Sequence, residues 1–153
     1  MSDRDATDAP TSERPARVLV VTDHTDAPPQ LLEAIHDRAE QGPSQFRILI
    51  PNPARAEAHL IHTERHEKAE EAERVFHDAL ASFEKAAGGR VIGSVSIRHD
   101  PFDAVEELMF NEPIDEFIVA IDTNGLSRRL HLDLHHRLVH LGLPITVVDA
   151  TEV

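Results

Sequence analysis

The chain has 153 residues, contains no cysteine and is acidic. Its 28 Asp and Glu residues outnumber its 15 Lys and Arg residues, and a net charge of −13 argues against nonspecific nucleic-acid binding, which needs a basic surface. The lack of cysteine excludes disulfides, thiolate zinc sites and thiol catalysis.

No apolar run approaches the roughly 20 residues of a membrane span. The first residues also lack the apolar segment of a signal peptide. We therefore expect a cytoplasmic protein with neither a membrane nor a nucleic-acid partner. Only Lys68 and Lys85 are lysines. Salt adaptation and codon bias both explain such an acidic, lysine-poor surface, and the sequence leaves the two open.

The N-terminal residues 1–16 are polar, contain proline and show no periodicity, so they predict a disordered tail. One domain is expected at 17–153, a length that can bury a core. It opens with the apolar run 18–21, which predicts a short buried strand ending at Thr22 and Asp23.

A helix is predicted next, because Pro28 and Pro29 suit a first helical turn. Asp26 is the expected N-cap of this helix. Residues 46–50 predict the second strand. Apolar residues at three- and four-residue spacing then predict an amphipathic helix over 72–87.

The stretch 54–68 ahead of that helix is far more polar, and indicates either a lid or a solvated helical extension. Residues 91–97 alternate apolar with small or polar residues, so the third strand is expected near a sheet edge. Asp100 and Pro101 open a short helix. A fourth strand is expected at 116–121.

A fourth helical segment is expected at about 127–141, and a fifth strand at 144–149. Strands that alternate with helices predict an α/β fold with right-handed crossovers. We expect a doubly wound five-stranded parallel sheet with helices on both faces, as in Rossmann-like proteins.

A polar, glycine-containing loop follows the fourth strand and leads into a helix that begins with two arginines. Ligands of doubly wound sheets bind outside the carboxyl ends of the strands, where this loop and the end of the first strand would meet. The predicted ligand-binding residues are Asp23, Asp122, Thr123, Asn124, Gly125, Ser127, Arg128 and Arg129.

This arrangement resembles the universal stress protein family over about 18–149. The resemblance lies in a first strand that ends in Asp23, in Asp100-Pro101 opening a short helix, and in a last strand entered through Pro144. It implies a stress-response protein that works by binding and not by catalysis. It also implies a homodimer through the last strand, Ile145 to Val148, which reads as an open edge without lysine or proline.

Nucleotide-binding members of this family carry Gly-x-x-Gly after the fourth strand and, after nine intervening residues, a Gly-Ser or Gly-Thr pair. Here the first motif reads Asp122-Thr-Asn-Gly125. The second falls on His135-His136 when counted from Gly125, or near His131-Leu132 when counted back from Pro144, and neither alignment restores it. Asp122 would place a carboxylate beside phosphate oxygens. The resemblance therefore implies that ordinary ATP binding is lost, although Arg128 and Arg129 could compensate in part.

The aspartate that matches Asp23 contacts the adenine end of the ligand in those members, so a nucleoside or mononucleotide stays open. The alternative is an adenine-nucleotide switch, taking AMP, ADP or ATP, with Asp23 at the base and 122–129 at the phosphates. Without the resemblance, Asp23 reads equally well as a carboxylate that caps nearby backbone N–H groups.

Eleven histidines form the other unusual feature, and three pairs have four-residue spacing: His62 with His66, His131 with His135, and His136 with His140. This spacing suits a metal or pH sensor, a further alternative to solvated or helix-capping histidines.

No enzyme is predicted, because the chain has no Gly-x-Ser-x-Gly elbow, no Walker A sequence and no Gly-x-Gly-x-x-Gly. Asp23 and Asp122 could pair for acid–base work or Mg²⁺ binding. Aspartates that cap loops at strand ends are, however, the commoner case.

Overall fold

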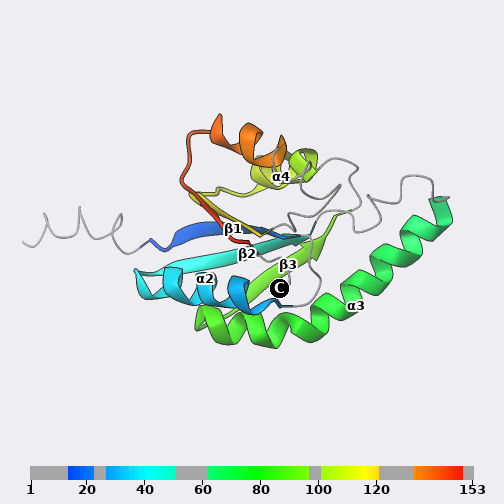
Figure 1. Ribbon diagram of the computed structural model, residues 1–153, viewed down its shortest axis with the longest axis horizontal. Coiled ribbons are helices and arrows are strands. Elements are labelled where there is room, and N and C mark those ends of the chain that lie inside the picture. Colours follow the sequence, from blue (N-terminus) through cyan, green and yellow to red (C-terminus); the bar gives the residue numbers. More distant parts are fainter. Residues whose placement is uncertain (1–13, 23–26, 51–61, 97–100, 121–132, 150–153) are drawn as a thin grey trace, which may run out of the picture.

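The computed structural model describes residues 14–22, 27–50, 62–96, 101–120 and 133–149 (Figure 1). Its strands form one five-stranded sheet in the order β3-β2-β1-β4-β5, and every neighbouring pair is parallel. The bounds of the strands are Ala16–Thr22 for β1, Ser44–Ile50 for β2, Val91–Val95 for β3, Glu116–Ala120 for β4 and Ile145–Val147 for β5.

Helices cover both faces of this sheet (Figure 1). The helices α2 (Pro29–Glu40) and α3 (His62–Ala87) lie on one face, and α4 (Pro101–Asn111) lies on the other with the helical residues 133–139. None of the described helices combines the length and apolar character that a membrane span requires.

Two apolar clusters, one on each face, form the core. The first joins α2 and α3 to the even-numbered residues of β1 and β2, such as Val20 and Ile48. The second joins α4 and Leu134 to the odd-numbered residues, such as Val21. Side chains alternate between the faces of a strand, so a strand buried on both faces must be apolar throughout. This is why Val18 to Val21 form an unbroken apolar run.

The predicted fold class is confirmed, with the five strands in their expected places and β3 and β5 at the two edges. The first strand begins at Ala16, the last residue of the expected tail, whereas 1–13 lie outside the described residues. The polar residues 62–68 are helical and continue into the amphipathic part of α3, while 54–61 lie outside the described residues.

The prediction that Asp26 caps the helix α2 is wrong. The N-cap residue is Pro28, and no side chain caps it by a hydrogen bond. The Pro28 carbonyl accepts hydrogen bonds from the backbone N–H groups of Leu31 and Leu32, both at 3.0 Å. Pro29 lacks an N–H group and has a φ fixed near the helical value, so it takes the first helical position and moves the cap to the residue before it.

Candidate functional site

The carboxyl ends of β1 and β4 lie side by side at one edge of the sheet, the carboxyl edge. The register pairs Thr22, the last residue of β1, with Ala120, the last residue of β4. Asp23 follows the first directly, and Asp122 lies two residues beyond the second. The two segments that the sequence assigns to ligand binding therefore leave the sheet from neighbouring positions.

The strand order reverses between β1 and β4. From β1 the chain proceeds through α2 to β2 on one side, and from β4 it proceeds through residues 133–139 to β5 on the other. The two connections also run over opposite faces, since α2 packs in one core cluster and Leu134 and Leu138 in the other. Connections that diverge in this way leave a crevice outside the strand ends, which is the usual ligand site of doubly wound sheets.

At the strand ends that frame this crevice, backbone pairing continues and the buried residues are almost all apolar. Backbone hydrogen bonds extend the ladder past the strand ends on both sides, from the Ser96 N–H to the Ile50 carbonyl and from the Val148 N–H to the Val119 carbonyl, each 2.8 Å long. Thr22 is the only polar residue among the described residues that are classed as buried. Its side chain is fully buried, and strand alternation directs it to the face that α2 and α3 cover.

A cavity of about 600 Å³ lies beside the crevice, between the carboxyl halves of β2 and β3 and the helix α4. Its described lining includes Leu49 and Ser96 from the strands and Ala104 from the helix. This volume lies in the range of small-molecule sites, roughly 300 to 1,000 Å³. None of its described lining comes from β1 or β4, so this cavity is separate from the crevice between those two strands.

Comparison with known proteins gives a fold and no sequence family. No protein-family model matches the chain, and no curated protein matches it in sequence. A structure of a universal stress protein from Archaeoglobus fulgidus superposes with a TM-score of 0.61 at 12% identity, covering 88% of this chain and 98% of the other. The chain has the universal stress protein fold.

Two further structures agree with this fold. A universal stress protein from Archaeoglobus fulgidus in complex with dAMP gives a TM-score of 0.59 at 14% identity, with 88% of this chain and 98% of the other covered. A protein described as hypothetical gives 0.53 at 16% identity, with 89% and 96% covered. At such identities the likeness to universal stress proteins is one of architecture, and the predicted resemblance is confirmed at that level.

All of the predicted ligand-binding residues lie outside the described residues. The structure describes the two strand ends, of β1 and β4, that these residues follow in the sequence. The histidine pairs are described in part. His136 and His140 pack edge to face with ring centroids 5.2 Å apart, so their four-residue spacing does place them together. Within the described residues, no group of three or more His, Asp or Glu forms a metal site.

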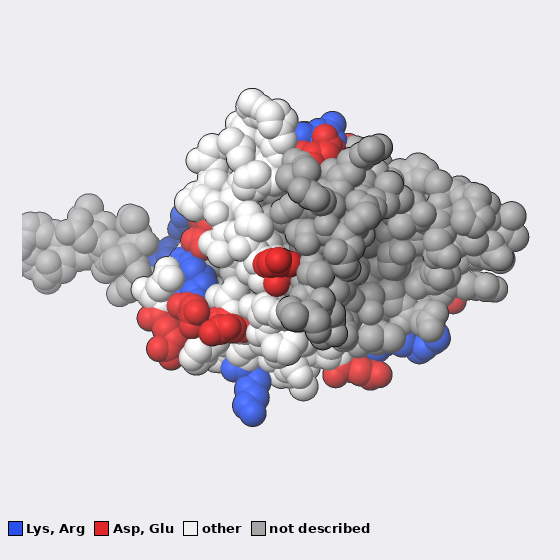
Figure 2. All heavy atoms as spheres, in the orientation of Figure 1, with Lys and Arg blue, Asp and Glu red and all other residues white. Residues whose placement is uncertain are grey.

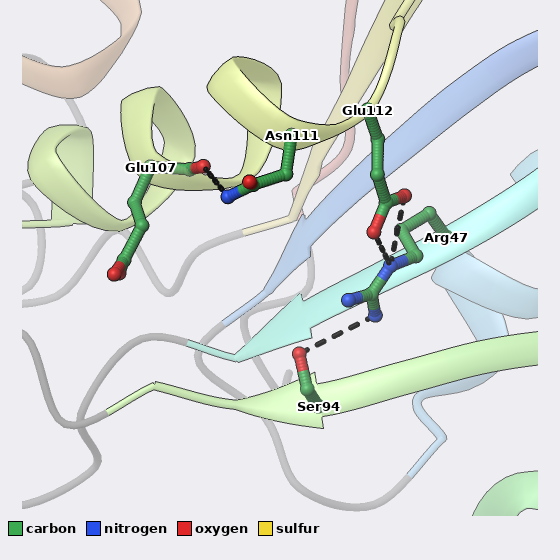
Figure 3. Close-up of polar contacts among 5 residues, drawn as sticks. All are labelled: Arg47, Ser94, Glu107, Asn111 and Glu112. Carbon is green, nitrogen blue, oxygen red and sulfur yellow. Dashed lines mark hydrogen bonds and ion pairs between the residues drawn. The ribbon is translucent and has the colours of Figure 1, made fainter.

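A polar cluster on the α4 face was not foreseen from the sequence (Figure 3). The Arg47 Nε group in β2 lies 3.2 Å from each carboxylate oxygen of Glu112, and its Nη1 group donates to the Ser94 hydroxyl at 3.3 Å. The signal was present as a single arginine inside the apolar run 46–50. Its partners come from β3 and from the segment after α4, so only the strand order brings them together.

Proposed function

We propose that this protein, on its universal stress protein fold, binds an adenine nucleoside monophosphate in the crevice between β1 and β4 and acts by binding and not by turnover. The observation that carries the proposal is the pairing of Thr22 with Ala120 at a strand-order reversal, because Asp23 and 122–129 follow these two strand ends in the sequence. The dAMP complex of a universal stress protein from Archaeoglobus fulgidus supports a ligand of this class.

The proposal is limited to monophosphates because of the sequence after β4. Asp122 replaces the first glycine of the resembled Gly-x-x-Gly turn, which removes close backbone access and adds a negative charge near the phosphates. His135 and His136 stand where a glycine and a hydroxyl residue would complete the cradle. A longer phosphate chain would meet these changes, whereas binding of the base would depend mainly on Asp23.

We further propose that the protein is a homodimer through β5. Three of the five exposed large apolar side chains among the described residues come from the C-terminal segment: Val139, Leu141 and Val147. Figure 2 shows an uncharged area over the segment that leads from residues 133–139 to β5. Leu141 also lines a surface hollow with Phe110 of α4, the most exposed of these five side chains. Exposed apolar surface next to an open strand edge favours pairing with a second copy.

Thermal unfolding tests the nucleotide proposal. Chelator-treated protein is melted with millimolar AMP, dAMP, ADP, ATP with Mg²⁺, or GMP as a control for the base. A ligand at about 100 times its Kd adds roughly 2.7 kcal/mol and raises the Tm by several degrees for a domain of this size. We expect shifts with AMP and dAMP that exceed those with ATP and GMP. Equal shifts with AMP and ATP would contradict the limit to monophosphates, and no shift with any nucleotide would contradict nucleotide binding.

Three variants locate the response. Asp23→Asn should abolish the AMP shift, because it removes the proposed contact to the base. Asp37→Asn makes the same change on the exposed face of α2, away from the strand ends, and should leave the shift intact. Asp122→Gly restores the resembled turn, so it should bring the ATP shift up toward that of AMP. An unchanged AMP response in Asp23→Asn would place the nucleotide elsewhere.

A further inference from the structure

The amino ends of three neighbouring strands place three arginines around one cavity of about 190 Å³. They are Arg17 in β1, Arg47 in β2 and Arg90, the residue before β3. The register pairs Arg17 with Gln45, and Val91 with Phe46, so Arg17, Gln45 and Arg90 lie at one level across the sheet. This cavity lies at the start of the strands, whereas the proposed nucleotide crevice lies beyond their ends.

Strand alternation explains why these side chains share a face. Leu19 and Leu49 pack in the cluster beneath α4, so Arg17 and Arg47, two positions earlier in each strand, point to the same face. The remaining wall comes from Glu112, Pro113 and Ile114, the segment between α4 and β4. The helices of this face lie over the centre of the sheet and leave Ile92 of β3 exposed.

The charges that line this cavity are three guanidinium groups and one carboxylate. Glu112 is held by Arg47, which in turn contacts Ser94, so this pair is neutral and fixed in place (Figure 3). Within the described part of the chain, the guanidinium groups of Arg17 and Arg90 make neither a hydrogen bond nor an ion pair. The excess of positive charge stands out in a protein whose net charge is −13.

Asp115 is a carboxylate outside the lining that contacts the backbone of Arg17. One of its oxygens accepts a hydrogen bond from the backbone N–H of Arg17 at 2.8 Å, and the other lies 3.9 Å from the Arg14 guanidinium. Asp115 is therefore occupied by a backbone group and by a different arginine. The guanidinium groups of Arg17 and Arg90 keep their donors for another acceptor.

We propose that this cavity binds a small molecule through a phosphate or carboxylate group, at a second site separate from the nucleotide crevice. Guanidinium forks match the geometry of both oxyanions and bind them with two parallel hydrogen bonds. The volume suits one such group with a short body, which would rest on the apolar side chains of Ile92, Pro113 and Ile114. Arg17 and Arg90 bind the anion, and Arg47 holds the wall.

An NMR titration tests this second site. Labelled protein is titrated with inorganic phosphate, and separately with propionate, up to about 20 mM at constant ionic strength. We expect saturating shifts in the amide signals of Gln45, Arg90 and Ile92 and in the Arg17 side-chain Nε signal. Saturation with phosphate alone identifies a phosphate ligand, and saturation with propionate alone a carboxylate ligand. Shifts confined to Thr22 and Ala120 would place the anion at the carboxyl edge and overturn the proposal, as would no saturation with either probe.

Matched variants distinguish anion binding in this cavity from nonspecific attraction of the anion by the protein's positive charges. Arg17→Gln with Arg90→Gln should weaken binding at least about tenfold, because both free guanidinium groups are lost. Arg74→Gln with Lys85→Gln removes the same charge from exposed positions on α3, and should keep the affinity within about twofold. Circular dichroism confirms that each variant is folded. Equal affinities for the two double variants would overturn the proposal, and this result does not depend on whether AMP binds.

Discussion

At the scale of single residues, Gly93 is fixed by what packs on it. It lies in β3, and a Cβ atom at this position would overlap the ring of Phe76 from α3. Phe76 is buried and contacts Phe83 with ring centroids 5.8 Å apart, so a shift of the ring away from Gly93 would disturb this contact. Gly93→Ala should therefore destabilise the protein by about 1–3 kcal/mol, as overpacked cores do. Urea unfolding followed by circular dichroism measures this loss.

Gly89 supplies the control, because a Cβ atom there would meet nothing within 4 Å. Gly89→Ala should leave the free energy of unfolding unchanged or raise it slightly. Adding Phe76→Leu to Gly93→Ala should recover part of the lost stability, since the smaller side chain makes room for the new methyl group. If Gly93→Ala unfolds at the same urea concentration as Gly89→Ala, this result would contradict the close packing of Phe76 on Gly93.

Among single residues, the sequence predicted best those features that depend on one side chain alone. Pro101 does begin a helix, and Arg47 is conspicuous once β2 is known to be apolar on both sides of it. The candidate nucleotide residues stay a prediction, because a loop's conformation depends on contacts that spacing does not encode. The predicted cap of α2, Asp26, lies two positions before the observed one, Pro28. Two successive prolines leave the first helical position open, and the extended backbone of Pro28 decides it.

At the scale of elements, burial explains which parts of the fold were predictable. The strands β1 and β4 are covered on both faces, so their sequences had to be apolar runs, whereas the edge strand β3 could alternate. The order of the strands left no local mark on the sequence. This is why the arginine cavity, whose members are 17, 47 and 90, could not be predicted.

One ion pair joins α2 to β4, in addition to the apolar cluster that they share. Arg38 of α2 meets Glu116 of β4 through two hydrogen bonds of 2.8 and 3.1 Å, and the side chains are 17% and 18% exposed. Arg38→Met would leave a largely enclosed carboxylate without this partner. We expect a loss of about 1–2 kcal/mol, below the 3–5 of a fully buried pair because some solvent remains.

The exposed pair of His36 and Glu40 on the same helix is the comparison for this experiment. These side chains are 57% and 69% exposed and 3.6 Å apart, so Glu40→Gln should cost at most about 0.5 kcal/mol. Replacing Arg38 and Glu116 together by methionine should cost less than the sum of the two single changes. A loss in Arg38→Met no larger than that in Glu40→Gln would contradict a role for the pair in docking α2.

At the scale of the whole molecule, the sheet has two edges at which a second copy could add. The edge strand β3 exposes Ile92, which lines the arginine cavity. The edge strand β5 exposes Val147, and the segment before it exposes Val139 and Leu141. Two chains of net charge −13 repel each other, so their interface must be apolar to hold. More exposed apolar side chains lie at or near β5 than on β3, and this favours β5 as the dimer interface.

Light scattering of Val147→Asp and Ile92→Asp at about 50 μM decides between the two edges. Each variant puts a carboxylate on an exposed apolar position of one edge strand. We expect the wild type and Ile92→Asp to be dimers. Val147→Asp should be a monomer, because the interface would bury the new carboxylate of each chain, and these two charges repel each other. Salt should strengthen the wild-type dimer by screening the repulsion of two acidic chains. A monomeric Ile92→Asp with a dimeric Val147→Asp would move the interface to β3, and a monomeric wild type would remove it.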